Sequence, residues 1–207
     1  MASQAICIKE LCSKDFPRAM QYCSEALQFK ECIRASLLDL YTKSFWYEET
    51  TDASLFLGAY AEDELLGILI ASFKDEEKPY HTWLNRIRKA VLGCFFFIAD
   101  STSRRYERAN KRLLKRFREK RDRKSVDGRI CLFVVSPQAQ GKGVGSRLMD
   151  ELRRKYKDAY VYLFTDNLCT FGYYDTHGFT REAATSFSYR LSGHTKRMDC
   201  FLYTKQL

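Results

Sequence analysis

The sequence predicts a single α/β domain with an elaboration, and three observations support this fold class. A short apolar run rich in β-forming residues, at residues 130–135, leads directly into a glycine-rich turn and a helical pattern. On both sides of this segment, further apolar runs of strand length are interspersed with patterns of helical period. With 207 residues, of which 45% are hydrophobic, the chain can bury a sizeable core.

The N-terminal third predicts a strand, two helices and a hairpin, in that order. Residues 5–11 suit a strand, and Ser13 or Asp15 can cap a helix with Pro17 in its first turn. A second helical pattern covers residues 31–40, whereas residues 45–52 show no clean period. Residues 54–60 and 65–73 then suit two strands, and the four residues between them give the spacing of a hairpin.

Residues 74–128 predict a helical insertion with a basic segment. One helical pattern runs from Trp83 to Ile98, and a second, from Tyr106 to Phe117, has apolar residues on one side and basic residues on the others. The apolar run at residues 90–99 is shorter than the roughly 20 residues of a membrane-spanning helix. The net charge of +9 comes from this region. Residues 104–124 carry 12 Lys and Arg against 3 acidic residues, and the charges of the remaining residues cancel.

The glycine-rich turn at residues 140–145 predicts an anion site. Pro137 ends the preceding strand, and a helix follows the glycines, since apolar residues recur every four positions from 144 to 156. The first N–H groups of a helix lack partners, its dipole makes that end positive, and glycine removes the Cβ that would keep a phosphate away. The glycines at 141, 143 and 145 fit neither the GxxxxGK[ST] loop nor the GxGxxG dinucleotide fingerprint.

The C-terminal part predicts a strand, a short helix and two final strands. The first strand covers residues 159–165, after which Asp166 and Asn167 can cap a short helix that ends at Gly178. The final strands are expected at residues 186–191 and 198–203, joined by a polar connection.

Two motifs in this part of the chain resemble those of the GNAT superfamily of acyl-CoA-dependent N-acyltransferases. Gln140, Gly143 and Gly145 match that family's pyrophosphate loop, Q/R-x-x-G-x-G/A, and residues 135–137 look like the V-x-P at the end of its fourth strand. Asn167 and Tyr174, with the Gly-Phe pair at 178–179, resemble the segment N-x6-Y-x3-G-F. The resemblance covers residues 129–207 firmly and residues 5–73 by the order of elements, and the insertion has no counterpart.

The resemblance implies a fold and a reaction. The expected fold is a mixed, mostly antiparallel central sheet flanked by helices and splayed between strands 4 and 5, with the insertion at about residues 74–128 between strands 3 and 4. The chain would form one GNAT N-acetyltransferase domain over residues 1–207. It would transfer an acetyl group from acetyl-CoA, its co-substrate, to a primary amine by direct attack, without a metal.

The resemblance also assigns roles to individual residues. The pyrophosphate would lie on the turn and the start of the helix, at Gln140, Gly141, Lys142, Gly143, Val144, Gly145 and Ser146. The pantetheine arm would pair with the backbone of Phe133, Val134 and Val135, and the Val135 N–H would polarise the thioester carbonyl. Tyr174 would protonate the departing thiolate, unless it packs only as a core residue. Asn167 would cap a helix or bind the pantetheine arm.

The general base stays open. The strand at residues 130–135 has no acidic residue, so Glu48, Glu49, His177 or a water chain could take the proton of the amine. Glu48 and Glu49 could equally be solvated loop charges, and His177 could be a surface residue.

The insertion and the partners allow several interpretations. The basic helix could present a solvated face, form a lid or wall whose Arg and Lys select an acidic acceptor, or dock on nucleic acid or an anionic membrane. The runner-up function is a non-catalytic acyl-CoA-binding or docking module that uses residues 104–124. We expect no specific nucleic acid, no transmembrane segment, reduced cysteines, a cytoplasmic location, and a monomer or homodimer.

Overall fold

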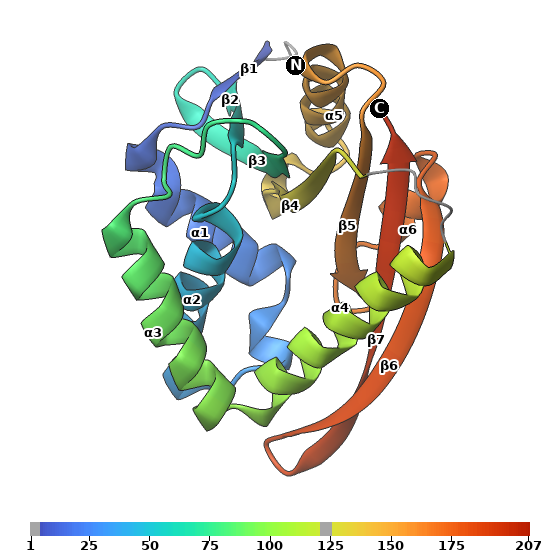
Figure 1. Ribbon diagram of the computed structural model, residues 1–207. Coiled ribbons are helices and arrows are strands. Elements are labelled where there is room, and N and C mark those ends of the chain that lie inside the picture. The colour runs from blue at the N-terminus through green and yellow to red at the C-terminus, as the bar shows by residue number, and fades with distance from the viewer. Residues whose placement is uncertain (1–4, 121–125) are drawn as a thin grey trace.

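The computed structural model describes residues 5–120 and 126–207, and its centre is a seven-stranded sheet of order β1-β2-β3-β4-β5-β7-β6 (Figure 1). All neighbouring strands are antiparallel except β4 and β5, which are parallel. These two strands pair only through Gly128 with Val161 and Arg129 with Tyr162, and beyond those pairs they separate. The predicted mixed sheet, splayed between strands 4 and 5, is therefore confirmed.

The N-terminal half begins with β1 (Ile6–Glu10) and α1 (Phe16–Ala26), as predicted. The second helix, α2, covers Leu38–Thr50, so the predicted helix at residues 31–40 was misplaced, and residues 45–50, which show no clean period, are helical. The period is hidden because α2 is packed on several sides: Phe45 meets Phe29, while Trp46 meets Phe16 of α1. The hairpin of β2 (Leu55–Ala61) and β3 (Glu64–Phe73) follows as predicted.

The insertion consists of α3 (Trp83–Ala99) and α4 (Ser101–Lys120), two helices as predicted. Residues 121–125 of the predicted basic segment lie outside the described residues. The apolar side of α4 packs on the C-terminal strands, where Ala109, Leu113 and Phe117 share a cluster with residues of β6 and β7. No helix of the described chain has the length and apolarity needed to cross a membrane.

The C-terminal half contains β4 (Gly128–Val135), α5 (Val144–Lys155), β5 (Tyr160–Asp166), α6 (Gly172–Thr176), β6 (Thr180–Leu191) and β7 (His194–Gln206). The last two strands are longer than predicted. Along β6 only Tyr189 is fully buried, so polar residues extend this edge strand beyond its apolar stretch. The helix predicted from Asp166-Asn167 begins only at Gly172, and Phe171 stands at its N-cap, so a capping role for Asn167 was wrong.

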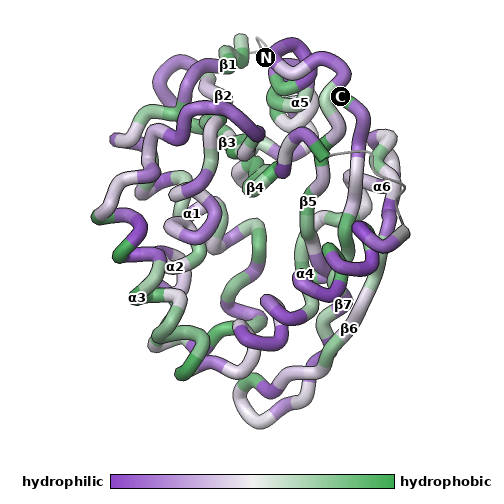
Figure 2. Tube along the Cα trace, viewed as in Figure 1, coloured by the Kyte–Doolittle hydropathy of each residue, from purple (hydrophilic) through white to green (hydrophobic). Residues whose placement is uncertain are grey.

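Two layers of helices place the core on both faces of the sheet. Helix α5 covers one face through Val144, Leu148 and Leu152, and α1 and α2 cover the other face beside β3 and β4. Helix α4 covers β6 and β7. The segment that joins α1 to α2 lies on the same side, because its residues Cys32 and Ile33 belong to the hydrophobic cluster that α4 forms with these strands. In Figure 2 hydrophobic residues are concentrated along the central strands β4 and β5, whereas much of α4 is hydrophilic. The splay of the sheet consequently opens between α1–α2 on one side and α4 on the other.

Candidate functional site

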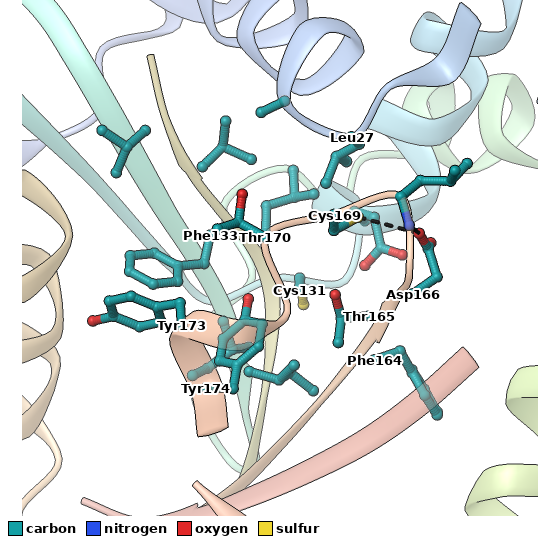
Figure 3. A pocket seen from close by; sticks show the side chains of 18 of the residues that line it. Leu27, Cys131, Phe133, Phe164, Thr165, Asp166, Cys169, Thr170, Tyr173 and Tyr174 are labelled. Atoms are coloured by element: carbon teal, nitrogen blue, oxygen red, sulfur yellow. Dashed lines mark hydrogen bonds between the residues drawn. The ribbon is translucent and has the colours of Figure 1, made fainter. Parts of the chain in front are cut away.

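A cavity of about 550 Å³ occupies the splay between β4 and β5 (Figure 3). Its lining comes from residues 26–49 around α1 and α2, from α4, from β4 and the glycine turn, and from the segment between β5 and the end of α6. The cavity thus joins segments far apart in sequence, among them the glycine turn and the segment that carries Tyr174. This arrangement makes it the candidate functional site.

The glycine turn has the backbone that an anion site needs. Gly141 and Gly143 have φ angles of 75° and 76°, in the left-handed region where other residues are strained, and Gly143 is the N-cap of α5. A Cβ on Gly145 would lie 3.2 Å from the ring of Phe133, so glycine there lets α5 approach β4. The free N–H groups at the start of α5 and the positive end of its dipole meet at the cavity.

Most of the predicted cofactor residues line the cavity. They are Phe133, Val134, Val135, Gln140, Gly141, Gly143, Val144, Gly145 and Ser146. Lys142 and Asn167 are not part of the lining. The side-chain oxygen of Asn167 instead accepts a hydrogen bond of 2.9 Å from the Asp199 N–H of β7, which ties the end of β5 to the neighbouring strand.

The edge of β4 leaves a backbone donor free for the cavity. The Ser136 N–H donates to the Leu66 carbonyl of β3 at 2.8 Å, and successive N–H groups of a strand point to opposite edges. The N–H of Val135 therefore points away from β3, to the side where β5 has separated. This is where the sequence placed an oxyanion donor.

Tyr174 lies on α6 among aromatic residues and directs its hydroxyl into the cavity (Figure 3). Its ring meets those of Tyr173, Phe179 and Tyr203 at centroid distances of 5.6, 5.1 and 5.4 Å. Burial raises the pKa of Tyr174 above its ordinary value, so the hydroxyl is protonated at neutral pH and can donate a proton. His177 is exposed, stacks on Tyr173 at 3.8 Å, and stands at the rim of the cavity.

The two candidate glutamates have different surroundings. Both carboxylate oxygens of Glu49 accept from Nη2 of Arg129, at 2.8 and 2.7 Å, and the Glu49 side chain is only 10% exposed. Glu48 is 57% exposed, lies 3.5 Å from Lys89, and is outside the cavity lining. Neither carboxylate is free to face a reacting amine in this arrangement.

The sequence did not single out four further polar residues of the cavity: Asp166, Tyr106, Asn110 and Arg129. Asp166 ends β5 and is 7% exposed; its Oδ1 accepts from the Leu168 N–H at 2.9 Å, and its Oδ2 from the Tyr106 hydroxyl at 3.2 Å. Burial raises the pKa of Asp166, although these donors oppose the rise. In the sequence, Asp166 resembled only a helix cap, and nothing linked it to α4.

Helix α4 forms a wall of the cavity, but its basic residues do not face it. Thr102, Ser103, Tyr106 and Asn110 of α4 line the cavity, whereas none of the basic residues from Arg104 to Arg118 does. For these described residues, the interpretation that Arg and Lys of the helix select an acidic acceptor is not supported. The described residues contain no group of three His, Cys, Asp or Glu that could hold a metal ion, and all eight cysteines are free.

Comparisons with known proteins agree with this geometry. The chain matches a family model described as acetyltransferase (GNAT) domain over residues 93–181, while no protein of curated function matches its sequence. A Corynebacterium glutamicum structure described as histone acetyltransferase HPA2 and related acetyltransferase is 17% identical, with a TM-score of 0.56 and coverage of 98% of this chain and 96% of that chain.

Two further solved structures share this fold. The PaiA N-acetyltransferase of Thermoplasma acidophilum, in complex with coenzyme A, is 14% identical, with a TM-score of 0.55 and coverage of 98% and 99%. The ribosomal-protein-alanine N-acetyltransferase of Brucella melitensis is 16% identical, with a TM-score of 0.53 and coverage of 97% and 99%. At these identities the similarity concerns the fold.

Proposed function

We infer that the chain, which matches the acetyltransferase (GNAT) domain model over residues 93–181 and shares the fold of GNAT structures, belongs to that superfamily. On this premise we propose that it is an N-acetyltransferase, which transfers the acetyl group of acetyl-CoA to a primary amine. The observation that carries the proposal is one cavity with three parts: a glycine turn at the start of α5, a strand edge of β4 that does not pair with β5, and the half-buried Tyr174. Each part suits one portion of an acyl-CoA.

The turn would bind the pyrophosphate. Gln140, Gly141, Gly143, Gly145 and Ser146 line the cavity where the first N–H groups of α5 are free. We assign Lys142 and Asn167 no contact with the co-substrate, because neither lines the cavity and Asn167 is bonded to β7. The coenzyme A in the Thermoplasma acidophilum structure supports this choice of co-substrate.

The strand edge would bind the pantetheine arm and the thioester. The arm would lie along Phe133, Val134 and Val135 like an added strand, since β5 does not pair with these residues. The Val135 N–H would then face the thioester carbonyl and stabilise the oxyanion that forms when the amine attacks. Tyr174 would give its proton to the departing thiolate.

The alternative is a module that binds acyl-CoA without turnover. Such a module would need the turn and the strand edge but no proton donor at the thiolate. Replacing Tyr174 with Phe separates the two functions, because an enzyme loses turnover and keeps binding.

A thermal melt with acetyl-CoA tests the co-substrate site. A ligand at one hundred times its Kd stabilises the folded state by about 2.7 kcal/mol, which raises the melting temperature of a chain of this size by several degrees. Gly143→Asp, which adds bulk and negative charge at the turn, should abolish the rise. Gly193→Asp is the matched control, since Gly193 also has a positive φ, of 83°, and lies in the remote turn between β6 and β7.

The melting temperatures of the native chain and the two variants decide whether acetyl-CoA binds at the turn. A rise with the native chain and with Gly193→Asp, but not with Gly143→Asp, supports acetyl-CoA on this turn. The absence of any rise for the native chain at saturating acetyl-CoA would contradict the proposal.

A further inference from the structure

The part of the cavity away from the glycine turn has apolar walls with several uncharged polar side chains between them, and one carboxylate without an ion-pair partner among the described residues. Its walls are formed by Leu27, Phe29, Ile33, Tyr41, Phe45 and Phe164. Glu49 and Arg129 neutralise each other, and His177 stands at the rim. Asp166 has three hydrogen-bond donors but no Lys or Arg at ion-pair distance among the described residues.

Two buried polar atoms of the lining have no hydrogen-bond partner among the described residues: Oδ1 of Asn110, on α4, and Nε of Arg129. The charge of Arg129 is already paired with Glu49, whereas the Asn110 oxygen has no partner of any kind in the described part of the chain. An unpartnered buried acceptor is costly, so it indicates a donor that arrives with a ligand. Asp166 and Asn110 together offer acceptors to a group rich in N–H, in an otherwise apolar chamber.

We propose that this chamber binds a compact, apolar primary amine in its ammonium form, and that Asp166 receives the ammonium proton before attack. The inference rests on the proposed acetyl transfer and names its acceptor class and its base. An acceptor with its own carboxylate is disfavoured, because that group would enter an apolar chamber whose net charge is negative. The body of the amine would pack against the aromatic walls.

The proton balance is closed by two groups of this chain. Asp166 takes one proton from the ammonium, and the neutral nitrogen forms a bond to the thioester carbon while the oxyanion faces the Val135 N–H. As the C–S bond breaks, Tyr174 gives its proton to the thiolate of CoA. The new amide nitrogen loses its second proton, which restores Tyr174 through solvent, and Asp166 releases its proton to solvent. The raised pKa of Asp166 makes it a stronger base than an ordinary aspartate.

Two amines that share one ring test the acceptor class on the native chain. Phenethylamine has the ammonium and an apolar body, and phenylalanine adds only a carboxylate. We expect kcat/KM, measured by release of the CoA thiol, to be at least about a hundredfold higher for phenethylamine, since like charges in contact strongly disfavour binding. Equal values, or turnover of phenylalanine alone, would overturn the inference.

Asp166→Asn tests the base. It should lower kcat/KM for phenethylamine by about 10²–10⁴-fold. Acetylation of hydroxylamine, a small nucleophile that is uncharged at neutral pH, should fall far less, because no proton has to leave before attack. Asp199→Asn is the control, since Asp199 pairs with Arg197 outside the cavity. Equal losses with both nucleophiles would contradict the role of Asp166.

Failure of this inference differs from failure of the proposed function. If acetyl-CoA raises the melting temperature and hydroxylamine is acetylated but phenethylamine is not, only the acceptor class is wrong. If acetyl-CoA does not bind at all, the proposed function fails first.

A separate observation concerns the outer face of α3. All the exposed large apolar side chains of the described chain lie on this helix: Trp83, Leu84, Ile87, Val91, Phe95, Phe97 and Ile98. Trp83, Ile87, Val91 and Phe95 are four residues apart and so form one stripe. The opposite side packs on α2, where Phe96 is 3% exposed and meets Tyr41 at 5.2 Å.

The surroundings of the stripe are basic. Residues 83–99 contain three basic residues and no acidic one, and α4, which follows directly, carries nine basic and two acidic residues. Within the described part of α4, the basic side chains from Arg105 to Arg118 are exposed. Figure 1 shows α3 at the outer edge of the molecule, beyond α2.

We infer that α3 and α4 dock the protein on an anionic lipid bilayer. An apolar stripe with Trp and Phe beside Arg and Lys is the pattern of a helix that lies in a membrane interface. A second copy of this chain would bring two basic surfaces together, whereas an anionic bilayer offers both an apolar layer and opposite charge. The stripe would enter the headgroup region while the basic residues contact lipid phosphates.

Tryptophan fluorescence can report binding of the protein to lipid vesicles. Trp83 is 72% exposed and Trp46 is 4% exposed, so only Trp83 should respond to vesicles. We expect a blue shift of its emission with phosphatidylcholine–phosphatidylglycerol vesicles, little with phosphatidylcholine alone, and reversal by salt. Val91→Glu should abolish the shift, whereas Thr195→Glu, at an exposed site of β7, should retain most of it.

Two outcomes would overturn this second inference. One is the absence of any shift with anionic vesicles. The other is a dimer in analytical ultracentrifugation that Val91→Glu dissociates, because a second copy of the chain would then occupy the stripe.

Discussion

The two ends of the cavity are built from different parts of the protein. At the glycine turn the cavity is formed mainly by main chain, through the start of α5 and the free edge of β4. At the other end it is formed by side chains of the α1–α2 segment, α4 and the end of β5, which meet only in the folded chain. Tyr174 lies between the two ends.

If the proposed function is correct, acetyl-CoA is bound at the first end of the cavity and the acceptor is selected at the second. Main-chain N–H groups can hold a phosphate or an oxyanion whatever side chains surround them, so this end depends on a few glycines. The acceptor end depends on individual side chains, so a single replacement there can alter the acceptor without loss of acetyl-CoA binding.

The largest effect is expected for Tyr174→Phe, which removes the proposed proton donor between the two ends. We expect kcat to fall by about 10²–10⁴-fold, as for loss of a general acid. The Kd for acetyl-CoA, measured by calorimetry, should stay within about twofold, because no other contact of the turn or strand edge depends on this hydroxyl.

Tyr60→Phe is the control for this variant. Its hydroxyl donates to Asp15 at 2.8 Å, in the cluster beneath α1, and it is not part of the cavity lining. Its kcat should be unchanged. A Tyr174→Phe enzyme with native kcat would assign Tyr174 a packing role only.

The end of the cavity at the glycine turn could be predicted from the sequence, because its residues are neighbours in the chain. Gly141, Gly143 and the start of α5 are consecutive in the chain, and their conformation depends on the absence of side chains at those positions. The strand before them followed from its apolar run, and the splay between strands 4 and 5 followed from the resemblance to the GNAT motifs. The spacing of apolar residues did not predict the position of α2, because a helix packed on several sides has no single apolar stripe.

The acceptor end could not be predicted in the same way. The partner of Asp166 on α4, Tyr106, lies 60 residues earlier, on an insertion without a counterpart in the family pattern. Glu49 was a candidate base in the sequence, but its partner Arg129 is 80 residues away, so the ion pair could not be predicted. Such contacts are fixed by tertiary packing and leave no local spacing.

A smaller effect is expected for Glu49→Gln, which leaves Arg129 without its carboxylate. Hydrogen bonds to charged groups contribute about 1.5–3 kcal/mol, and we expect a loss of unfolding free energy in this range. Glu48→Gln is the matched control, because its contact with Lys89 is long and exposed and should contribute less than about 1 kcal/mol. Urea denaturation of both variants measures the difference, and equal losses would show that burial of the pair contributes nothing.

The smallest effect is expected for Tyr106→Phe, and it tests the acceptor end alone. Loss of its hydrogen bond to Asp166 should cost about 1 kcal/mol of stability. Tyr189→Phe should cost a similar amount, since its hydroxyl donates to the Glu31 carbonyl at 2.9 Å in the same cluster. Only the first variant should change catalysis.

The sign of that change follows from the role of the hydroxyl. The Tyr106 hydroxyl stabilises the Asp166 carboxylate, so its removal raises the pKa of Asp166 further. The other titratable groups around Asp166 are Cys32, Tyr41, Cys169, Tyr189 and Cys200, whose pKa values are all raised by burial, so they are neutral at neutral pH. Because protonated Asp166 cannot accept a proton, the acidic limb of the kcat/KM profile should move to higher pH. A limb that stays in place in Tyr106→Phe would show that Asp166 does not titrate in catalysis, whatever the loss in stability.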